Sequence, residues 1–199
     1  MYYIIKMKIN KLVFALLAAL VLGACSSSPK VSPVPSIEED AEPPQGPKYL
    51  EYSENYEVTI STPSLVVFNW HRDYYSGGAH GMQEKTWYVI DKKANETIRR
   101  SDVFKPGSEG QLQELIESAL RKRDKLESYE ALSSGVYFED TVEITDNYFF
   151  SRTGVGFHWD PYEIAPYSEG IIEIILPYGD LRSLLNQKGL ALAEEVQKG

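Results

Sequence analysis

The chain has 199 residues with one cysteine, 20 Lys and Arg, and 29 Asp and Glu, for a formal net charge of −9. A single cysteine excludes an intramolecular disulfide and a multi-thiolate zinc or iron–sulfur site, because each needs at least two sulfurs. The acidic balance argues against a general nucleic-acid-binding protein, which neutralises phosphates with Lys and Arg. With 25% charged and 12% aromatic residues, the composition is that of a globular protein, and the length suits one domain.

Residues 1–24 have the pattern of a bacterial export signal. Three lysines and no acidic residue precede an apolar run from Leu12 to Leu22. This run is too short to cross a membrane as a helix, which takes about 20 residues. Either Met1 or Met7 can start the chain, because the segment from Met7 onward is a complete signal by itself.

The signal ends on Leu22-Gly23-Ala24-Cys25, which resembles the lipobox of bacterial lipoproteins. The resemblance implies cleavage before Cys25 and a diacylglyceryl group on its thiol, and two or three acyl chains are enough for stable anchoring. The alternative is an ordinary secretory signal that ends at an unrelated cysteine. We expect a lipid-anchored protein of the bacterial cell envelope that faces outside the cytoplasm. Ser26, in place of Asp after the cysteine, implies the outer membrane if the cell has one.

A spacer and a folded domain follow the signal. Residues 25–47 begin with the expected lipid-bearing cysteine, contain six prolines and have few large apolar side chains. Such a segment cannot bury enough surface to offset its chain entropy, so we expect an extended tether. Residues 48–199 are expected to form one domain, which is long enough to bury a core.

Strands are predicted where polar and apolar residues alternate or where β-branched and aromatic residues gather. These segments are residues 56–60, 65–71, 86–90, 147–152, 155–159 and 170–176. Thr153-Gly154 is the expected turn of a hairpin. The last segment is strongly apolar, and we expect it to be a central strand.

One long helix is predicted between the two groups of strands. Its apolar residues recur at helical spacing: Leu112, Leu115, Ile116, Ala119 and Leu120. Shorter helices are expected from Asp180, as the capping residue, to Leu185, and over residues 190–196. The order of elements predicts an α+β fold with a mainly antiparallel sheet, one long amphipathic helix and short C-terminal helices.

Two segments have more distinctive sequences than a strand, helix or turn requires. They are Tyr74-Tyr-Ser-Gly-Gly-Ala-His-Gly81 and Phe157-His-Trp-Asp-Pro-Tyr-Glu-Ile-Ala-Pro-Tyr-Ser-Glu-Gly170. Together they resemble the PdaC/RsiV-like superfamily over roughly Tyr56 to Leu185. Its members are bacterial envelope proteins with a shared domain of unknown function, found in a lysozyme-sensing anti-sigma factor, in some peptidoglycan deacetylases and in small lipoproteins. The chain shows no sigma-binding segment, which argues against an anti-sigma role, and no catalytic deacetylase domain.

The two motifs supply the candidate ligand-binding residues: Tyr75, His80, Tyr162 and Tyr167. The glycines beside His80 are typical of positions that need positive φ or close backbone approach. Two interpretations of His80 stay open: it locks the turn by donating to a backbone carbonyl, or it contacts a ligand. The prolines of the second motif favour an extended loop, and its tyrosines either pack or offer hydroxyl groups at its edge.

Two of the three histidines lie in His-x-Asp pairs, His71 with Asp73 and His158 with Asp160. Positions i and i+2 of a strand share one face, so each pair can present an imidazole and a carboxylate to a metal, with His80 as a further ligand. The alternative is that these are ordinary residues near strand ends, because neither pair has a signature such as His-Glu-x-x-His. We predict no metal site and no cofactor, and these five residues are the candidates if a metal binds.

No catalytic residue is predicted. No serine lies in a Gly-x-Ser-x-Gly elbow, and the only cysteine is expected to carry the anchor. We expect a non-catalytic envelope lipoprotein whose domain binds a protein or a cell-wall glycan. The acidic charge favours a cationic partner, and the resemblance implies a basic lysozyme-like protein or peptidoglycan, with no nucleic acid.

Two alternatives stay open beside that function. Acidity can serve solubility alone, and the tyrosines can simply fill a β core. The chain can also be an accessory or catalytic peptidoglycan-modifying protein, deacetylase-like or hydrolase-like, that uses the His/Asp metal site.

Overall fold

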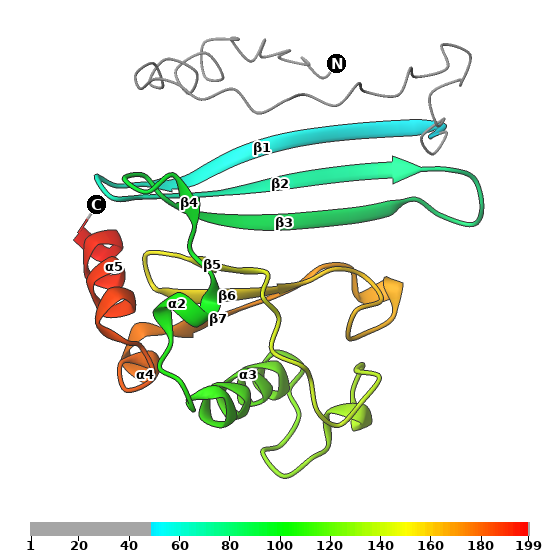
Figure 1. Ribbon diagram of the computed structural model, residues 1–199. Coiled ribbons are helices and arrows are strands. Elements are labelled where there is room, and N and C mark those ends of the chain that lie inside the picture. The colour runs from blue at the N-terminus through cyan, green and yellow to red at the C-terminus, as the bar shows by residue number, and fades with distance from the viewer. Residues whose placement is uncertain (1–48, 199) are drawn as a thin grey trace, which may run out of the picture. The chain divides into compact units, whose positions relative to one another are not determined.

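The computed structural model describes residues 49–198, so the predicted signal, Cys25 and the tether lie outside the described part. The elements are β1 (Glu51–Ser61), β2 (Leu65–Tyr75), β3 (Met82–Asp91), β4 (Glu96–Thr97), α2 (Arg100–Val103), α3 (Glu109–Arg123), η1 (Leu132–Ser134), β5 (Tyr148–Phe150), β6 (Gly154–Trp159), η2 (Tyr167–Glu169), β7 (Ile172–Pro177), α4 (Tyr178–Leu181) and α5 (Gln187–Lys198) (Figure 1). Together they confirm the predicted α+β class. Within this range, no helix combines the length and the apolar character that a membrane span requires.

The first sheet is a meander in the order β1-β2-β3-β4, with antiparallel neighbours. The predicted strands 56–60, 65–71 and 86–90 are confirmed, and each extends further than its apolar run. Leu65, Val67 and Val89 are buried on one face of this sheet, at the end nearer the β1–β2 turn. The opposite end, where β2 passes into β3, carries the first motif.

The second sheet has the order β5-β6-β7 and is also antiparallel. The predicted hairpin around Thr153-Gly154 is confirmed, and all residues of β6 are buried. The expectation that residues 170–176 form a central strand is wrong, because β6 is central and β7 is an edge strand. One face of β7 is buried beneath α3, which accounts for most of its apolar residues, whereas Ile175 on the other face is 46% exposed.

The helices cover one side and one end of the second sheet (Figure 1). Leu112, Ile116 and Leu120 of α3 are buried, as the helical spacing predicts. The expected cap at Asp180 is wrong, because α4 begins at Tyr178 directly after Pro177 and contains Asp180 in its first turn. The terminal helix begins earlier than expected.

A polar side chain also starts that terminal helix. The Oδ1 atom of Asn186 accepts a hydrogen bond of 3.0 Å from the backbone N–H of Gly189. Its Nδ2 group donates to the carbonyl oxygens of Asp102 and Phe104. This single asparagine therefore starts α5 and ties it to the α2 segment.

The two sheets meet where side chains close the free edge of β3. The backbone N–H of Lys85 donates to Oδ1 of Asp160 at 2.9 Å, and that of Trp87 donates to Oδ1 of Asn147 at 2.8 Å. The Nδ2 group of Asn147 donates to the carbonyl of Lys85 at 2.7 Å. These bonds replace a backbone ladder, so this part of the β3 edge is satisfied without a partner strand.

Aromatic packing reinforces this junction. The rings of Trp87 and Phe149 are stacked with centroids 3.9 Å apart. Phe149 in turn lies over Gly156, where an added Cβ atom would overlap its ring. The absence of a side chain at Gly156 therefore lets the two sheets approach each other.

Candidate functional site

The structure brings the two sequence motifs together. The loop between β2 and β3 carries His80, and the segment between β6 and β7 carries Tyr162 and Tyr167. The ring of His80 stacks on Tyr167 with centroids 3.8 Å apart and 18° between the planes. Its Nε2 atom lies 3.2 Å from the hydroxyl oxygen of Tyr162. Three of the four predicted ligand-binding residues thus form one aromatic cluster, and Tyr75 lies at the foot of the same loop.

His80 also locks its own turn. Its Nδ1 atom lies 2.8 Å from the carbonyl oxygen of Gly81. Because a carbonyl only accepts hydrogen bonds, Nδ1 carries the proton, and in the neutral ring Nε2 accepts from the hydroxyl of Tyr162. This geometry supports the turn-locking interpretation and leaves the ligand interpretation compatible with it, since the tyrosine side of the cluster stays exposed.

The loop backbone explains the glycines of the first motif. Gly77 and Gly78 have φ values of +103° and +118°, which side-chain-bearing residues rarely adopt. The hydroxyl of Tyr75 donates to the carbonyl of Gly78 at 2.8 Å. The turn is therefore held by Tyr75 from one side and by His80 from the other.

The second motif presents its tyrosines from a compact loop. The backbone N–H of Tyr162 donates to the carbonyl of Ala165 at 3.1 Å, and the N–H of Asp160 donates to Oε2 of Glu163 at 2.6 Å. Tyr162 has a positive φ of 73°, and 51% of its surface is exposed. Such a conformation is uncommon for a residue with a side chain, and here it directs a tyrosine toward solvent.

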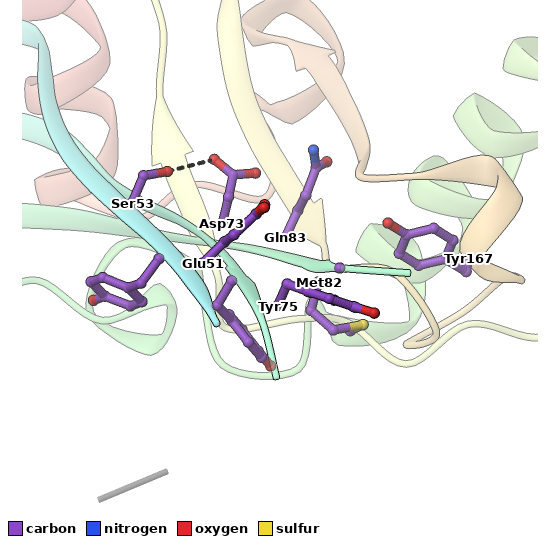
Figure 2. Close-up of a pocket in the computed structure, with 10 residues that line it drawn as sticks. Glu51, Ser53, Asp73, Tyr75, Met82, Gln83 and Tyr167 are labelled. Atoms are coloured by element: carbon purple, nitrogen blue, oxygen red, sulfur yellow. Dashed lines mark hydrogen bonds between the residues drawn. The ribbon is translucent and has the colours of Figure 1, made fainter. Parts of the chain in front are cut away.

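A pocket of about 370 Å³ lies beside this cluster. One face of the first sheet supplies Glu51, Ser53, Asp73, Tyr75 and Gln83, and the chain between β6 and β7 supplies Tyr167. Figure 2 shows Tyr167 on its own segment, separated from the labelled residues of β1 and β2, with Gln83 drawn between them.

The pocket lining is polar and acidic. It contains two carboxylates and no Lys, Arg or His. The hydroxyl of Ser53 and the Nε2 atom of His71 both lie near Oδ2 of Asp73, at 3.5 and 3.0 Å. Carboxylate, amide and tyrosine hydroxyl groups can accept hydrogen bonds from sugar hydroxyls or ammonium groups, and aromatic rings offer apolar contact area. The lining therefore suits a hydroxyl-rich or cationic group and disfavours an anion.

The second His-x-Asp pair serves a different purpose. His158 is fully buried, with Nε2 2.8 Å from Oδ1 of Asp160 and Nδ1 2.8 Å from Oε1 of Glu173. Ionised carboxylates only accept hydrogen bonds, so both ring nitrogens donate and His158 is held as the imidazolium. The two carboxylates lie at opposite nitrogens of the ring and do not converge on a common point.

The electrostatics of this buried group agree with its geometry. Burial by itself lowers the pKa of His158, but the hydrogen bonds and charges of Asp160 and Glu173 outweigh it and raise the pKa above its usual value. Burial alone raises the pKa of Glu173, whereas hydrogen bonds from His158 and Trp87 and the charge of Lys85 lower it to about 2. The group is a cross-linked charge network at the junction of the two sheets.

The five metal candidates do not form one site. His71 contacts Asp73 beside the pocket, His158 contacts Asp160 in the interior, and His80 contacts tyrosines. Over residues 49–198, no group of three or more His, Cys, Asp or Glu residues is arranged to hold a metal ion.

Sequence reasoning missed several residues of these sites. Glu51, Ser53 and Gln83 line the pocket, and Glu173 completes the buried network. Alternation along residues 51–57 signals a strand with a polar face, but only the strand register places that face against the second motif.

Comparisons with known proteins agree with this fold. A family model described as "Protein of unknown function (DUF3298)" matches residues 101–179, which include the second motif. No curated protein matches the sequence. The chain is similar to the crystal structure of a DUF3298 family member from Bacteroides fragilis, with 24% identity and a TM-score of 0.66 over 76% of this chain and 60% of that one.

A second solved structure is also similar. It is a DUF3298 family protein from Pseudomonas aeruginosa, with 23% identity and a TM-score of 0.58 over 68% of this chain and 62% of that one. The chain thus spans about three fifths of the length of each of these two structures. At these identities the matches support a common fold.

Proposed function

We propose that this chain, whose residues 101–179 match the DUF3298 family model and whose motifs resemble the PdaC/RsiV-like domain, is a non-catalytic ligand-binding protein of the bacterial envelope. In this proposal Cys25 carries the lipid anchor, residues 25–47 are the tether, and the described domain faces outside the cytoplasm. The ligand is a basic lysozyme-like protein or a cell-wall glycan.

The meeting of the two motif loops carries this proposal. His80, Tyr162 and Tyr167 come from two loops and form a cluster that borders the acidic pocket. A purely architectural contact does not require a tyrosine that is half exposed in a positive-φ conformation. An exposed aromatic cluster next to carboxylates is a suitable surface for sugar rings or for a cationic protein.

Charge supports the same ligand classes. The pocket lining has two carboxylates and no basic residue, and the whole chain carries a net charge of −9. An acidic surface raises the encounter rate with a basic protein, and this effect weakens as salt screens it. A glycan, in contrast, binds through hydroxyl groups and depends little on salt.

The test measures binding of the purified full chain to lysozyme and to insoluble peptidoglycan at 50 and 300 mM salt. We expect one of these ligands to be retained. The variant Tyr167→Ala should weaken binding at least tenfold, because it removes the ring that joins both loops and lines the pocket. Tyr129→Ala is the matched control, since Tyr129 is 85% exposed and lies outside the pocket lining.

Three results would contradict the proposal. The first is that the chain retains neither lysozyme nor peptidoglycan. The second is that the Tyr167 and Tyr129 variants lose binding affinity equally, which would place the binding site elsewhere on the surface. Release of acetate or of sugar fragments from peptidoglycan by the pure chain would instead support the peptidoglycan-modifying alternative. Thermal unfolding of both variants shows whether a loss of binding reflects a loss of folding.

The anchor has a separate test. Mass spectrometry of the protein from the membrane fraction should find an acylated Cys25 at the new N-terminus. The variant Cys25→Ala should leave the membrane fraction. An unmodified Ser26 at the N-terminus would contradict lipidation without affecting the binding proposal.

A further inference from the structure

The strand β1 is a long free edge of the first sheet. It spans 11 residues, about twice the usual strand length, and among residues 49–198 it pairs only with β2. Every residue of β1 except Ile60 is exposed. An edge strand directs every second N–H and C=O group away from its sheet, so β1 can accept one more strand.

The usual protections of a free edge lie at one end of β1. The pairing with β2 shifts register between Val58 and Ile60, and Pro63 follows the strand. Bulges and prolines of this kind discourage strand addition, as do lysines along an edge. The part from Glu51 to Val58 has no bulge, proline or lysine, and its only charged side chains are three glutamates, so its backbone is open to a strand of opposite charge.

The two faces of this part of β1 differ in chemistry. One face presents Tyr52, Tyr56 and Val58, which are 46%, 56% and 62% exposed. The register places Tyr56 opposite Trp70 of β2, and their rings are stacked with centroids 6.5 Å apart. Glu54 lies between Tyr52 and Tyr56 on this face, where its Oε2 atom accepts hydrogen bonds from the hydroxyl of Tyr52 and from Nε1 of Trp70. This face is therefore an aromatic strip that continues from β1 onto β2 around one hydrogen-bonded carboxylate.

The other face of β1 is polar and acidic. Strand alternation places Glu51, Ser53, Asn55 and Glu57 on it, and Ser53 contacts Asp73 while Glu57 contacts Asn69. The whole strand has three glutamates and no Lys or Arg. None of these three glutamates forms an ion pair with another described residue.

We propose that β1 binds an extended segment of a partner protein in which apolar and basic residues alternate, through strand addition along Glu51–Val58. Backbone hydrogen bonds to the free edge provide affinity, and the two faces provide specificity. The apolar residues of the added strand pack beside Tyr52, Tyr56 and Val58. Its Lys or Arg residues lie beside Glu51 and Glu57.

Charge argues against a second copy of the chain as the occupant. A second β1 brings three more glutamates and no cation, so pairing gathers like charges along one edge. A strand with Lys or Arg at alternate positions instead neutralises Glu51 and Glu57, which share one face. This surface includes Tyr56–Val58, which lie outside the pocket lining, and the inference does not depend on the proposed function.

The test uses the purified full chain and a capped eight-residue peptide of alternating lysine and valine. We expect saturable binding in a fluorescence anisotropy titration and at least tenfold slower hydrogen exchange of the β1 amides that point away from β2. A peptide of alternating glutamate and valine should not bind. A lysine–valine peptide with N-methyl groups on alternate backbone amides should lose binding, because it cannot form the ladder.

Charge-neutralising variants locate the interaction. The double variant Glu51→Gln/Glu57→Gln should weaken peptide binding at least fivefold and keeps amide oxygens as acceptors. The control Glu114→Gln/Glu143→Gln changes the net charge equally at two exposed glutamates outside β1 and should have no such effect. Tyr167→Ala should leave peptide binding unchanged, which separates this result from the test of the pocket.

Several results would overturn the inference. These are undetectable binding at millimolar peptide, equal weakening by both double variants, and undiminished binding of the N-methylated peptide. Protection, without peptide, of the β1 amides that point away from β2 would also overturn it. Protection that rises with protein concentration would assign the edge to a second copy, and protection that is independent of concentration would assign it to residues 1–48.

Discussion

The imidazole of His158 and the carboxylate of Glu173 face each other across the β6–β7 pair, with Nδ1 and Oε1 2.8 Å apart. The same oxygen of Glu173 also accepts from Trp87 Nε1 at 2.9 Å and from Lys85 Nζ at 3.2 Å. Both of those donors belong to β3. One carboxylate oxygen therefore accepts from three donors, two of which belong to the other sheet, and it does so at a residue that no sequence motif marks.

The stability of the domain should depend on pH through this pair. The pKa of His158 is raised above 6.5 in the folded state, so its contribution is complete below about pH 6.5 and is lost as pH rises through the raised pKa. The pKa of Glu173 is lowered from 4.5 to about 2, so its contribution is complete above pH 4.5 and is lost as pH falls toward 2. Urea unfolding from pH 3 to 9 should give the highest free energy of unfolding between about pH 4.5 and 6.5. A free energy that rises steadily from pH 6 to 9 would contradict this assignment.

Replacement of His158 should substantially lower the free energy of unfolding. His158→Gln leaves two partly buried carboxylates without the imidazolium between them, and breaking such a network typically costs about 3 kcal/mol. His71→Gln is the matched control, because the side chain of His71 is 24% exposed and its contact with Asp73 should contribute less than about 1 kcal/mol. The free energies of unfolding of both variants, measured at pH 6, check the prediction. Similar losses for the two variants would show that His158 is not held as described.

The side chain of Asn147 should contribute more to the free energy of unfolding than its position in a loop suggests. Asn147→Asp keeps an acceptor for the N–H of Trp87 but replaces the donor to the carbonyl of Lys85 with a carboxylate. Asn147→Ala removes both bonds and leaves two backbone groups of the β3 edge unsatisfied. We expect losses of about 1–3 kcal/mol for either change and faster hydrogen exchange of the Trp87 amide in the alanine variant. Unchanged exchange at Trp87 would mean that another group satisfies this edge.

Gly156 should not tolerate a methyl group. An added Cβ overlaps the ring of Phe149, so Gly156→Ala must displace Phe149 and the stacked Trp87. We expect a loss of about 1–3 kcal/mol and an altered near-ultraviolet circular dichroism signal from the tryptophan. Gly179→Ala is the control, since nothing lies within 4 Å of its added Cβ and its φ is not positive. An unchanged aromatic signal in the Gly156 variant would contradict the described packing.

Local sequence patterns were sufficient to predict the main helices and strands and to detect the family resemblance. The helical spacing of Leu112, Ile116 and Leu120 predicts the buried face of α3, and the glycines before His80 predict a turn with positive φ. Both features depend on interactions between residues close in the chain. They can be read without knowing what packs against them.

The place of a strand within its sheet could not be predicted from such local patterns. The apolar content of residues 170–176 suggests a central strand, yet β7 is an edge strand that hides one face beneath α3. Burial by a helix and burial by two neighbouring strands leave a similar composition. The two His-x-Asp pairs likewise have the same spacing in the sequence. One nevertheless lies beside the pocket, and the other is a buried cross-link.

The acidic composition, the single cysteine in a segment that resembles a lipobox and the two motifs are properties of the sequence by itself, because each is a matter of residue identity and not of tertiary contacts. The tertiary structure alone decided that His80 stacks on Tyr167, that Glu51 and Asp73 share a pocket, and that β1 keeps a free acidic edge. These relationships depend on strand register and on contacts between segments far apart in the chain. A shift of register by one residue would turn every side chain of a strand to its other face.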